Sequence, residues 1–213
     1  RGESNRGGHG QVLPAPNLSP NSWASQEVSP LNVKAVKVRK MPDGTKTPDG
    51  TTVRYTLDGS EPTEESEIMP SIGLMITENT VIKAAMYKEG YIRSETTTRV
   101  YLFHNREIGI PIISLVMDHD DLYSDDYGII SNNMTNQDRN NWRRPAVLDY
   151  FSRGGKTTYL HMPTEVRISG AWSREAALKS MIIYADKHES LDMNKLEPIL
   201  EGYEYYTNAF YEE

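Results

Sequence analysis

The chain has 213 residues, a formal net charge of −7, 37% hydrophobic residues and a mean hydropathy of −0.62. This length allows one or two ordinary domains, and no apolar run approaches the roughly 18 residues that a transmembrane helix needs. Cysteine is absent, which excludes disulfides, thiolate metal sites and cysteine nucleophiles.

The charge is unevenly distributed along the chain. Residues 1–103 hold 12 Lys and Arg against 12 Asp and Glu, whereas residues 104–213 hold 11 against 18 and so carry the whole net charge. A negative field repels phosphate backbones, and the basic cluster of the second half is limited to Arg143 and Arg144. We therefore expect no nucleic-acid partner.

Residues 1–29 are predicted to be a flexible or extended lead-in. Residues 1–10 are polar and Gly-rich without the apolar stretch of a signal peptide, so we expect any such peptide to have been removed or to lie outside this chain. Residues 12–30 hold four prolines among Ser and Asn, which is typical of extended chain or an edge strand.

Short strands separated by turn signals predict a small antiparallel sandwich within residues 30–103. The segment MPDGTKTPDG, residues 41–50, contains two Pro-Asp-Gly turn signals and predicts a long hairpin loop. The predicted strands are residues 32–40, 53–57, 80–87 and 96–103.

The stretch VRYTLDGSEPT, residues 53–63, combines a strand with a well-specified turn. Val53, Tyr55 and Leu57 alternate, which predicts three side chains on the inward face. Asp58 can close an Asx turn on its own backbone, and Gly59 accepts a positive φ. We interpret this turn as structural.

Two segments carry a resemblance to a known family. YTLDGSEPT, followed by TVIKAAMYKEGYIRSE, resembles the chitobiase/β-hexosaminidase C-terminal domain over residues 30–103. The turn, the TVIKA strand and the Gly-Tyr-x-x-Ser ending occur in the order of that family. The resemblance implies an Ig-like β-sandwich that acts as an accessory module without glycosidase chemistry, since a fold does not transfer an activity.

The pattern changes after a predicted boundary at residues 103–109. IPIISLVM, residues 110–117, is a continuous apolar strand that we expect to be buried on both faces. Residues 171–177 fit either a loop or one helical turn. The other elements predicted here are strands at 142–151, 163–170 and 178–185, a turn at 153–156 and a helix within 195–213.

This second half resembles the beginning of the CotH family of spore-coat-type atypical protein kinases. The motifs are IPIISLVMD, DDLYSDDYGI, WRRPAVLDYF and EVRISGAWSREAALKSMIIYA, which together span roughly residues 108–186. The resemblance implies that residues 108–213 are the N-terminal part of an α+β domain whose metal-binding and catalytic carboxylates lie further downstream. The expected fold class is mainly β with some α: an Ig-like sandwich followed by an incomplete CotH-like module.

The CotH resemblance implies four cofactor-binding candidates: Gly170, Ser173, Arg174 and Lys179. A kinase-like fold needs a lysine beside a Gly-rich turn to neutralise nucleotide phosphates. The sequence departs from the family pattern, because Ala171 follows Gly170 and the bulky Trp172 stands where backbone must approach phosphate.

Each of these candidates also has a structural interpretation. Lys179 could be a solvated strand lysine, and Arg174 could form an ion pair with Glu165 or Glu175. Arg143 and Arg144 are expected to pair with acidic side chains, Asp138 or Asp149, rather than with a ligand.

The acidic run after residue 117 raises the possibility of a calcium site, because carboxylate oxygens suit a hard cation. The spacing is not that of an EF-hand, since Leu122 and Tyr123 occupy the fifth and sixth positions from Asp118. We expect no metal here: Asp118 should cap a short helix, with Asp121 in its first turn. The carboxylates concerned are Asp118, Asp120, Asp121, Asp125 and Asp126.

No other catalytic constellation stands out. The five histidines lack an i,i+4 pair for zinc, and neither a G-x-S-x-G elbow nor a Walker-type loop is present. Two converging carboxylates for glycoside hydrolysis cannot be chosen among 30 acidic residues. We therefore predict no catalytic residue.

Two functional hypotheses follow. The first is a non-catalytic accessory or binding segment of a bacterial cell-envelope or secreted protein, without a cofactor, whose partner is a protein or a cell-surface polysaccharide. The alternative is the nucleotide-binding front part of an atypical CotH-family protein kinase, which would use ATP and Mg²⁺ and be completed by residues after 213. The sequence that follows residue 213 would discriminate between them.

Overall fold

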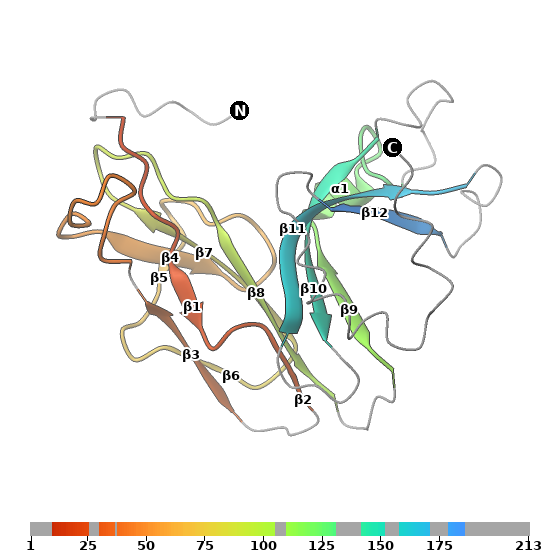
Figure 1. Cartoon of the computed structure of the whole chain (residues 1–213), viewed down its shortest axis with the longest axis horizontal. Helices are drawn as coiled ribbons and strands as arrows, with labels where there is room; N and C mark the ends of the chain where they lie inside the picture. Colours follow the sequence, from red (N-terminus) through yellow and green to blue (C-terminus); the bar gives the residue numbers. More distant parts are fainter. Residues whose placement is uncertain are drawn as a thin grey trace. The chain divides into compact units, whose positions relative to one another are not determined.

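The computed structural model describes residues 10–25, 30–36, 38–104, 110–130, 142–151, 158–170 and 179–185. The chain divides into two compact units, Arg1–Glu107 and Ile108–Glu213, so the division falls inside the interval predicted for the linker. The described part of each unit is built mainly of β-strands (Figure 1). Within that part, no helix is long and apolar enough to cross a membrane.

The first unit is a β-sandwich of two sheets. The three-stranded sheet has the order β1-β3-β6, and the five-stranded sheet has the order β2-β8-β7-β4-β5. The strands are β1 Asn17–Ser19, β2 Trp23–Ser25, β3 Leu31–Val36, β4 Thr52–Thr56, β5 Glu67–Ile68, β6 Leu74–Ile76, β7 Thr80–Tyr87 and β8 Thr97–Phe103.

A single core joins the two sheets of the sandwich. The smaller sheet contributes Leu18, Val33 and Ile76, and the larger sheet contributes residues such as Ile82 and Tyr101. All five are at most 4% exposed. This shared core confirms the sandwich that the alternating strands predicted.

The N-terminal segment belongs to this sandwich. β1 pairs antiparallel with β3, and β2 pairs in parallel with β8, so both are edge strands. Leu13 and Leu18 are 2% and 0% exposed. The edge-strand interpretation of residues 12–30 is therefore correct, but the sandwich begins well before residue 30.

Further hydrogen bonds fasten the N-terminal segment along the last strands of the sandwich. Leu13 N donates to Ile92 O and Ile92 N to Gln11 O, both at 3.0 Å. Val100 N donates to Ser22 Oγ at 3.1 Å, and Tyr101 OH to the Pro20 carbonyl at 2.7 Å. Because prolines lack an N–H, this segment makes use of carbonyls and side chains where a regular ladder is impossible.

The hairpin predicted for residues 41–50 forms only locally, where Lys40 and Lys46 make an antiparallel bridge, and it does not join β3 to β4. β3 and β4 lie in different sheets, so the segment between them crosses from one sheet to the other. Met41 is 4% exposed and packs into the core, and Thr47 N donates to Arg39 O at 2.9 Å. The two Pro-Asp-Gly segments therefore form turns within this crossover.

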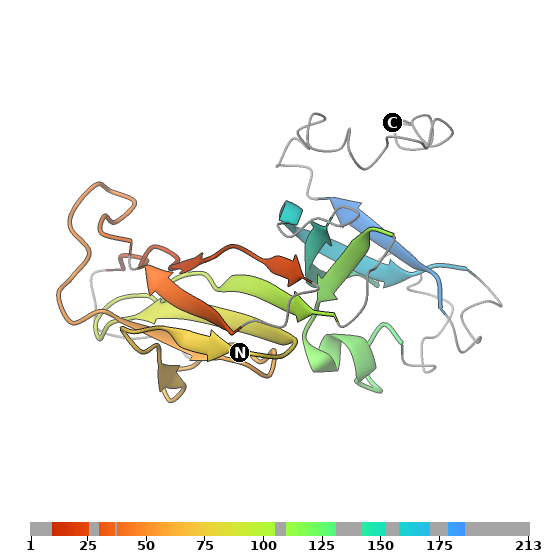
Figure 2. The same ribbon diagram turned by 90° about the horizontal axis from the view of Figure 1, so that it is seen from below.

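The second unit contains a four-stranded antiparallel sheet of order β12-β11-β10-β9. Figure 2 shows α1 lying against one face of it, where Leu122 packs on a core that includes Ala146 and Val166. The elements are β9 Ile112–Val116, α1 His119–Tyr123, β10 Arg144–Phe151, β11 Thr158–Ile168 and β12 Met181–Ala185.

β9 and α1 test two predictions for this unit, the burial of the apolar strand and the capping role of Asp118. β9 is an edge strand and Ile113 is 57% exposed, so its expected burial on both faces is wrong. Asp118 does cap α1, because its Oδ1 accepts from Asp120 N at 2.9 Å, and Asp121 lies in the first turn. The segments 153–156, 171–177 and 195–213 lie outside the described residues, and the α+β character expected of this unit stays a prediction.

Candidate functional site

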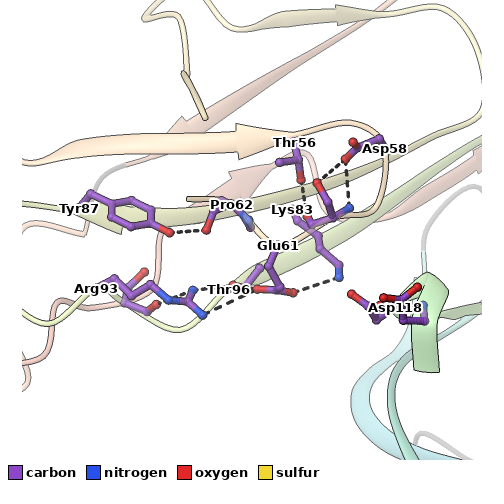
Figure 3. Close-up of polar contacts among 12 residues, drawn as sticks. Thr56, Asp58, Glu61, Pro62, Lys83, Tyr87, Arg93, Thr96 and Asp118 are labelled. Atoms are coloured by element: carbon purple, nitrogen blue, oxygen red, sulfur yellow. Dashed lines mark hydrogen bonds and ion pairs between the residues drawn. The ribbon is translucent and has the colours of Figure 1, made fainter. Parts of the chain in front are cut away.

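The outer face of β7 holds a polar cluster. Ile82, Ala84 and Met86 point into the core, whereas Lys83 and Tyr87 alternate onto the opposite face and are still only 6% and 8% exposed. The segment of residues 57–66 covers them. Figure 3 shows its contacts with β7 and with residues that follow β7 in the chain.

The turn at the start of this segment forms as predicted. Asp58 Oδ1 accepts from Ser60 N at 3.0 Å and from Ser60 Oγ at 2.6 Å, and Gly59 has a φ of 84°. The hydrogen bonds from the Ser60 hydroxyl and N–H hold the pKa of the Asp58 carboxyl below its ordinary value. Leu57 is 46% exposed, contrary to its predicted inward position, because β4 ends at Thr56 and the turn begins there.

Glu61 is the centre of what we call the Glu61 cluster, which comprises Glu61, Lys83, Arg93 and Thr96. Lys83 Nζ lies 3.0 Å from Glu61 Oε1, and the Thr96 hydroxyl donates to Oε2 at 2.6 Å. Arg93 Nη2 lies 3.9 Å from the same Oε2. Burial acts to raise the pKa of the Glu61 carboxyl, but the hydrogen bonds and positive charges outweigh it and the pKa falls below its ordinary value.

Two tyrosines complete the attachment of the segments that follow β4. The Tyr87 hydroxyl donates to the Pro62 carbonyl, and burial raises the pKa of Tyr87. The Tyr55 hydroxyl donates to Glu67 Oε2 at 2.7 Å, and burial together with this carboxylate raises the pKa of Tyr55 to about 12. Both hydroxyls therefore remain protonated donors at neutral pH.

The polar groups of the Glu61 cluster make their contacts with one another. The lysine, the arginine and the threonine hydroxyl all face one carboxylate, and each contact fastens the 57–66 segment to the sheet. Our sequence reasoning did not identify this cluster. The available signal was Lys83 itself, a single charge inside the apolar strand TVIKAAMY that requires an acidic partner when buried.

The second unit contains a buried ionisable pair that was also not predicted. Asp149 on β10 stands opposite His161 on β11 in the strand register, with His161 Nδ1 at 2.8 Å from Asp149 Oδ1. Asp149 is 0% exposed, whereas the His161 side chain is 28% exposed. A buried carboxylate of this kind needs such a partner because its desolvation is costly.

The arginine pair makes different contacts from those predicted. Arg143 Nη1 lies 3.4 Å from Glu165 Oε2, and its guanidinium stacks over Tyr184 at 3.7 Å from the ring centroid. Arg144 Nε lies 3.5 Å from Asp121 Oδ1. Asp149 is therefore not the arginine partner that we expected, and Asp138 lies outside the described residues.

The structure places two of the four predicted nucleotide-site residues. Gly170 has a φ of 102° and follows β11, while Lys179 precedes β12. Ser169 N donates to Ser180 O at 2.7 Å, which brings these two residues to the same end of the β11–β12 pair. Ser173 and Arg174 lie outside the described residues, and the direction of the Lys179 side chain toward Gly170 stays a prediction.

No group of three or more metal-ligating side chains gathers among the described residues. Within the acidic run, Asp118 caps α1 and Asp121 faces Arg144. Two of the five carboxylates in the run, those of Asp118 and Asp121, therefore have structural roles.

Comparison with known proteins finds a family model that is similar to part of the first unit. Residues 45–101 match the family model described as Fn3 associated, a domain of fibronectin-III-associated, Ig-like type. The match spans β4 to β8 and so includes the whole Glu61 cluster. No curated protein and no solved structure matches the chain. The closer resemblances to the chitobiase C-terminal domain and to CotH stay predictions.

Proposed function

We propose that the chain is a non-catalytic accessory and binding segment of a bacterial cell-envelope or secreted protein. One observation carries the proposal: the polar side chains of the most distinctive motif hold the 57–66 segment on the sheet, because Lys83 and Thr96 both contact the Glu61 carboxylate. The Fn3-associated match of residues 45–101 supports an accessory module. The cell-envelope or secreted location rests on the motif resemblances alone.

The experiment is a binding panel with the full chain. Immobilised neutral and acidic polysaccharides are incubated with the protein, and the bound fraction is measured together with released reducing ends. We expect retention by at least one polymer without hydrolysis. Retention by no polymer, or hydrolysis that a single substitution abolishes, would overturn the proposal.

A nucleotide site at the β11–β12 end is the second candidate. It is favoured by the left-handed backbone of Gly170 near the start of β12, the place where the resemblance puts a phosphate-binding turn. Phosphoryl transfer also needs Mg²⁺ ligands, which the family places further downstream. We therefore expect Mg-ATP affinity no tighter than about millimolar, roughly −4 kcal/mol.

Calorimetry with Mg-ATP tests this second candidate. Micromolar affinity that disappears in Lys179→Ala would replace the accessory proposal by the kinase-like one. Unchanged weak affinity in Lys179→Ala would remove Lys179 from consideration as a nucleotide ligand.

A further inference from the structure

A hollow of about 780 Å³ lies beside β3 and the crossover that follows it. Its size is within the range of ordinary ligand pockets, about 300–1,000 Å³. We call it the crossover groove. It is lined by Lys34, Ala35, Val36, Val38, Arg39, Lys46, Thr47, Pro48, Asp49, Gly50, Thr51 and Ser71.

The lining of the crossover groove is positively charged. It contains three cations and a single acid, and that acid, Asp49, pairs with Lys46 at 2.8 Å. Lys34 and Arg39 are exposed, and neither makes an ion pair with an acid of the described residues. Lys88 adds a further charge nearby, because its Nζ would stand 3.1 Å from a Cβ built on Gly50.

The crossover wall of the groove is held in place before any ligand binds. Met41 anchors the crossover in the core, and the Thr47 hydroxyl donates to Val38 O at 2.6 Å. The Thr51 hydroxyl donates to Pro48 O at 2.7 Å. These buried anchors make the wall rigid.

The segment that follows Ser71 in the chain is also held on β3. Asn32 Nδ2 donates to Ile72 O at 3.1 Å. Gly73 has a φ of 92° and packs so closely on β3 that a Cβ there would stand 2.7 Å from Val33 O. A preformed site of this kind loses little conformational entropy on binding.

We propose that the crossover groove binds an acidic polysaccharide through its carboxylates, with Lys34 and Arg39 as the principal contacts. This inference rests on the proposed binding function and names the class of its ligand. Lys34 and Arg39, which lack an acidic partner among the described residues, supply the attraction, and the Ser71 hydroxyl and the exposed aliphatic side chain of Val36 suit the rest of a sugar unit.

The groove suits other polymers less well. Among the described residues, its lining contains no aromatic side chain on which nucleic-acid bases could stack. β1 pairs with Lys34–Val36 along one side of β3 and β6 pairs with Leu31–Val33 along the other, so neither side of β3 is open over its full length to an added peptide strand. Backbone groups in the crossover, such as Thr47 N and Arg39 O, are already paired with each other.

The test titrates the full chain with alginate, a polyuronate, at several salt concentrations. Lys34→Gln and Arg39→Gln should each weaken binding about 3-fold and together about 10-fold, and added salt should weaken it further. Arg143→Gln is the matched control, because it removes one positive charge from the other unit, where Arg143 contacts Glu165 and Tyr184, and should leave binding unchanged. Circular dichroism checks that each variant is folded.

Each comparison ligand decides one part of the proposal. Equal binding of carboxyl-reduced alginate would overturn the role of charge, and stronger binding of polyglutamate or polyphosphate would overturn the polysaccharide class. Alginate binding that both groove variants leave intact would overturn the location. Retention by neutral polymers alone would overturn this inference while leaving the proposed binding function standing, whereas retention by none would overturn both.

Discussion

The Lys83–Glu61 pair of the sandwich and the Asp149–His161 pair of the second unit each include a buried ionisable side chain, and the two pairs are arranged in opposite ways. In the sandwich the buried partner is the cation: the side chain of Lys83 is 8% exposed and that of Glu61 is 47% exposed. In the second unit the buried partner is the acid, since Asp149 is 0% and His161 is 28% exposed. Loss of a partner is most costly when a charge remains in the interior, so Glu61 and His161 should be the sensitive residues.

The largest effect is expected for His161→Leu, which removes the imidazole from a fully buried carboxylate. It should cost about 3 kcal/mol or more in the free energy of unfolding, and Asp149→Leu should cost less. Hydrogen exchange measured by mass spectrometry reports the effect in peptides of β10 and β11. A larger cost for Asp149→Leu would break the comparison.

The sandwich should show the same asymmetry at a smaller scale. Glu61→Leu leaves the buried Lys83 ammonium without its carboxylate and should cost about 2–3 kcal/mol. Lys83→Met keeps the side-chain volume and leaves Glu61 in contact with Thr96 and with water, so about 1 kcal/mol is expected. Urea unfolding of both variants measures the difference, and equal costs would count against it.

The turn that carries Glu61 can be loosened without touching any charge. Gly59→Ala should cost about 1 kcal/mol because φ is 84° there, while no heavy atom stands near the added Cβ. Gly90→Ala is the matched control, with a φ of 82° and an equally open surrounding. Both should destabilise the sandwich, but only Gly59→Ala should speed hydrogen exchange in residues 57–66.

The smallest effect is the pH dependence that Glu61 contributes. Its pKa is lowered in the folded chain, so its stabilising contribution is complete above the ordinary value of 4.5. That contribution is lost as the pH falls through the lower folded pKa. Glu61→Gln should therefore flatten the stability profile below about pH 4.5, and an identical acid profile in both proteins would contradict the assignment.

Local features were predictable from the sequence because their partners lie within a few residues. The Asx turn joins Asp58 to Ser60, and the cap of α1 joins Asp118 to Asp120, so residue type and spacing were sufficient. The prediction that Leu57 points inward was wrong because it extended the alternation of side chains beyond Thr56. β4 ends at that residue, and the turn begins there.

The candidate sites could not be predicted because they depend on strand register. Lys83 meets Glu61 only because β7 pairs with β4 and the 57–66 segment folds back over it. Asp149 and His161 are 12 residues apart and meet across a strand pair whose alignment no local pattern specifies. The crossover groove likewise depends on β3 and β4 lying in different sheets, which the hairpin prediction did not anticipate.

The parallel pairing of β2 with β8 has a mechanical consequence. A pull on the chain before β2 and after β8 acts along the two strands in opposite directions, because they run the same way. The three registered pairs, Trp23–Tyr101, Ala24–Leu102 and Ser25–Phe103, are then sheared together rather than opened one after another. The sandwich should thus resist tension transmitted through its ends better than a terminal hairpin would, and single-molecule pulling from those ends would measure that resistance.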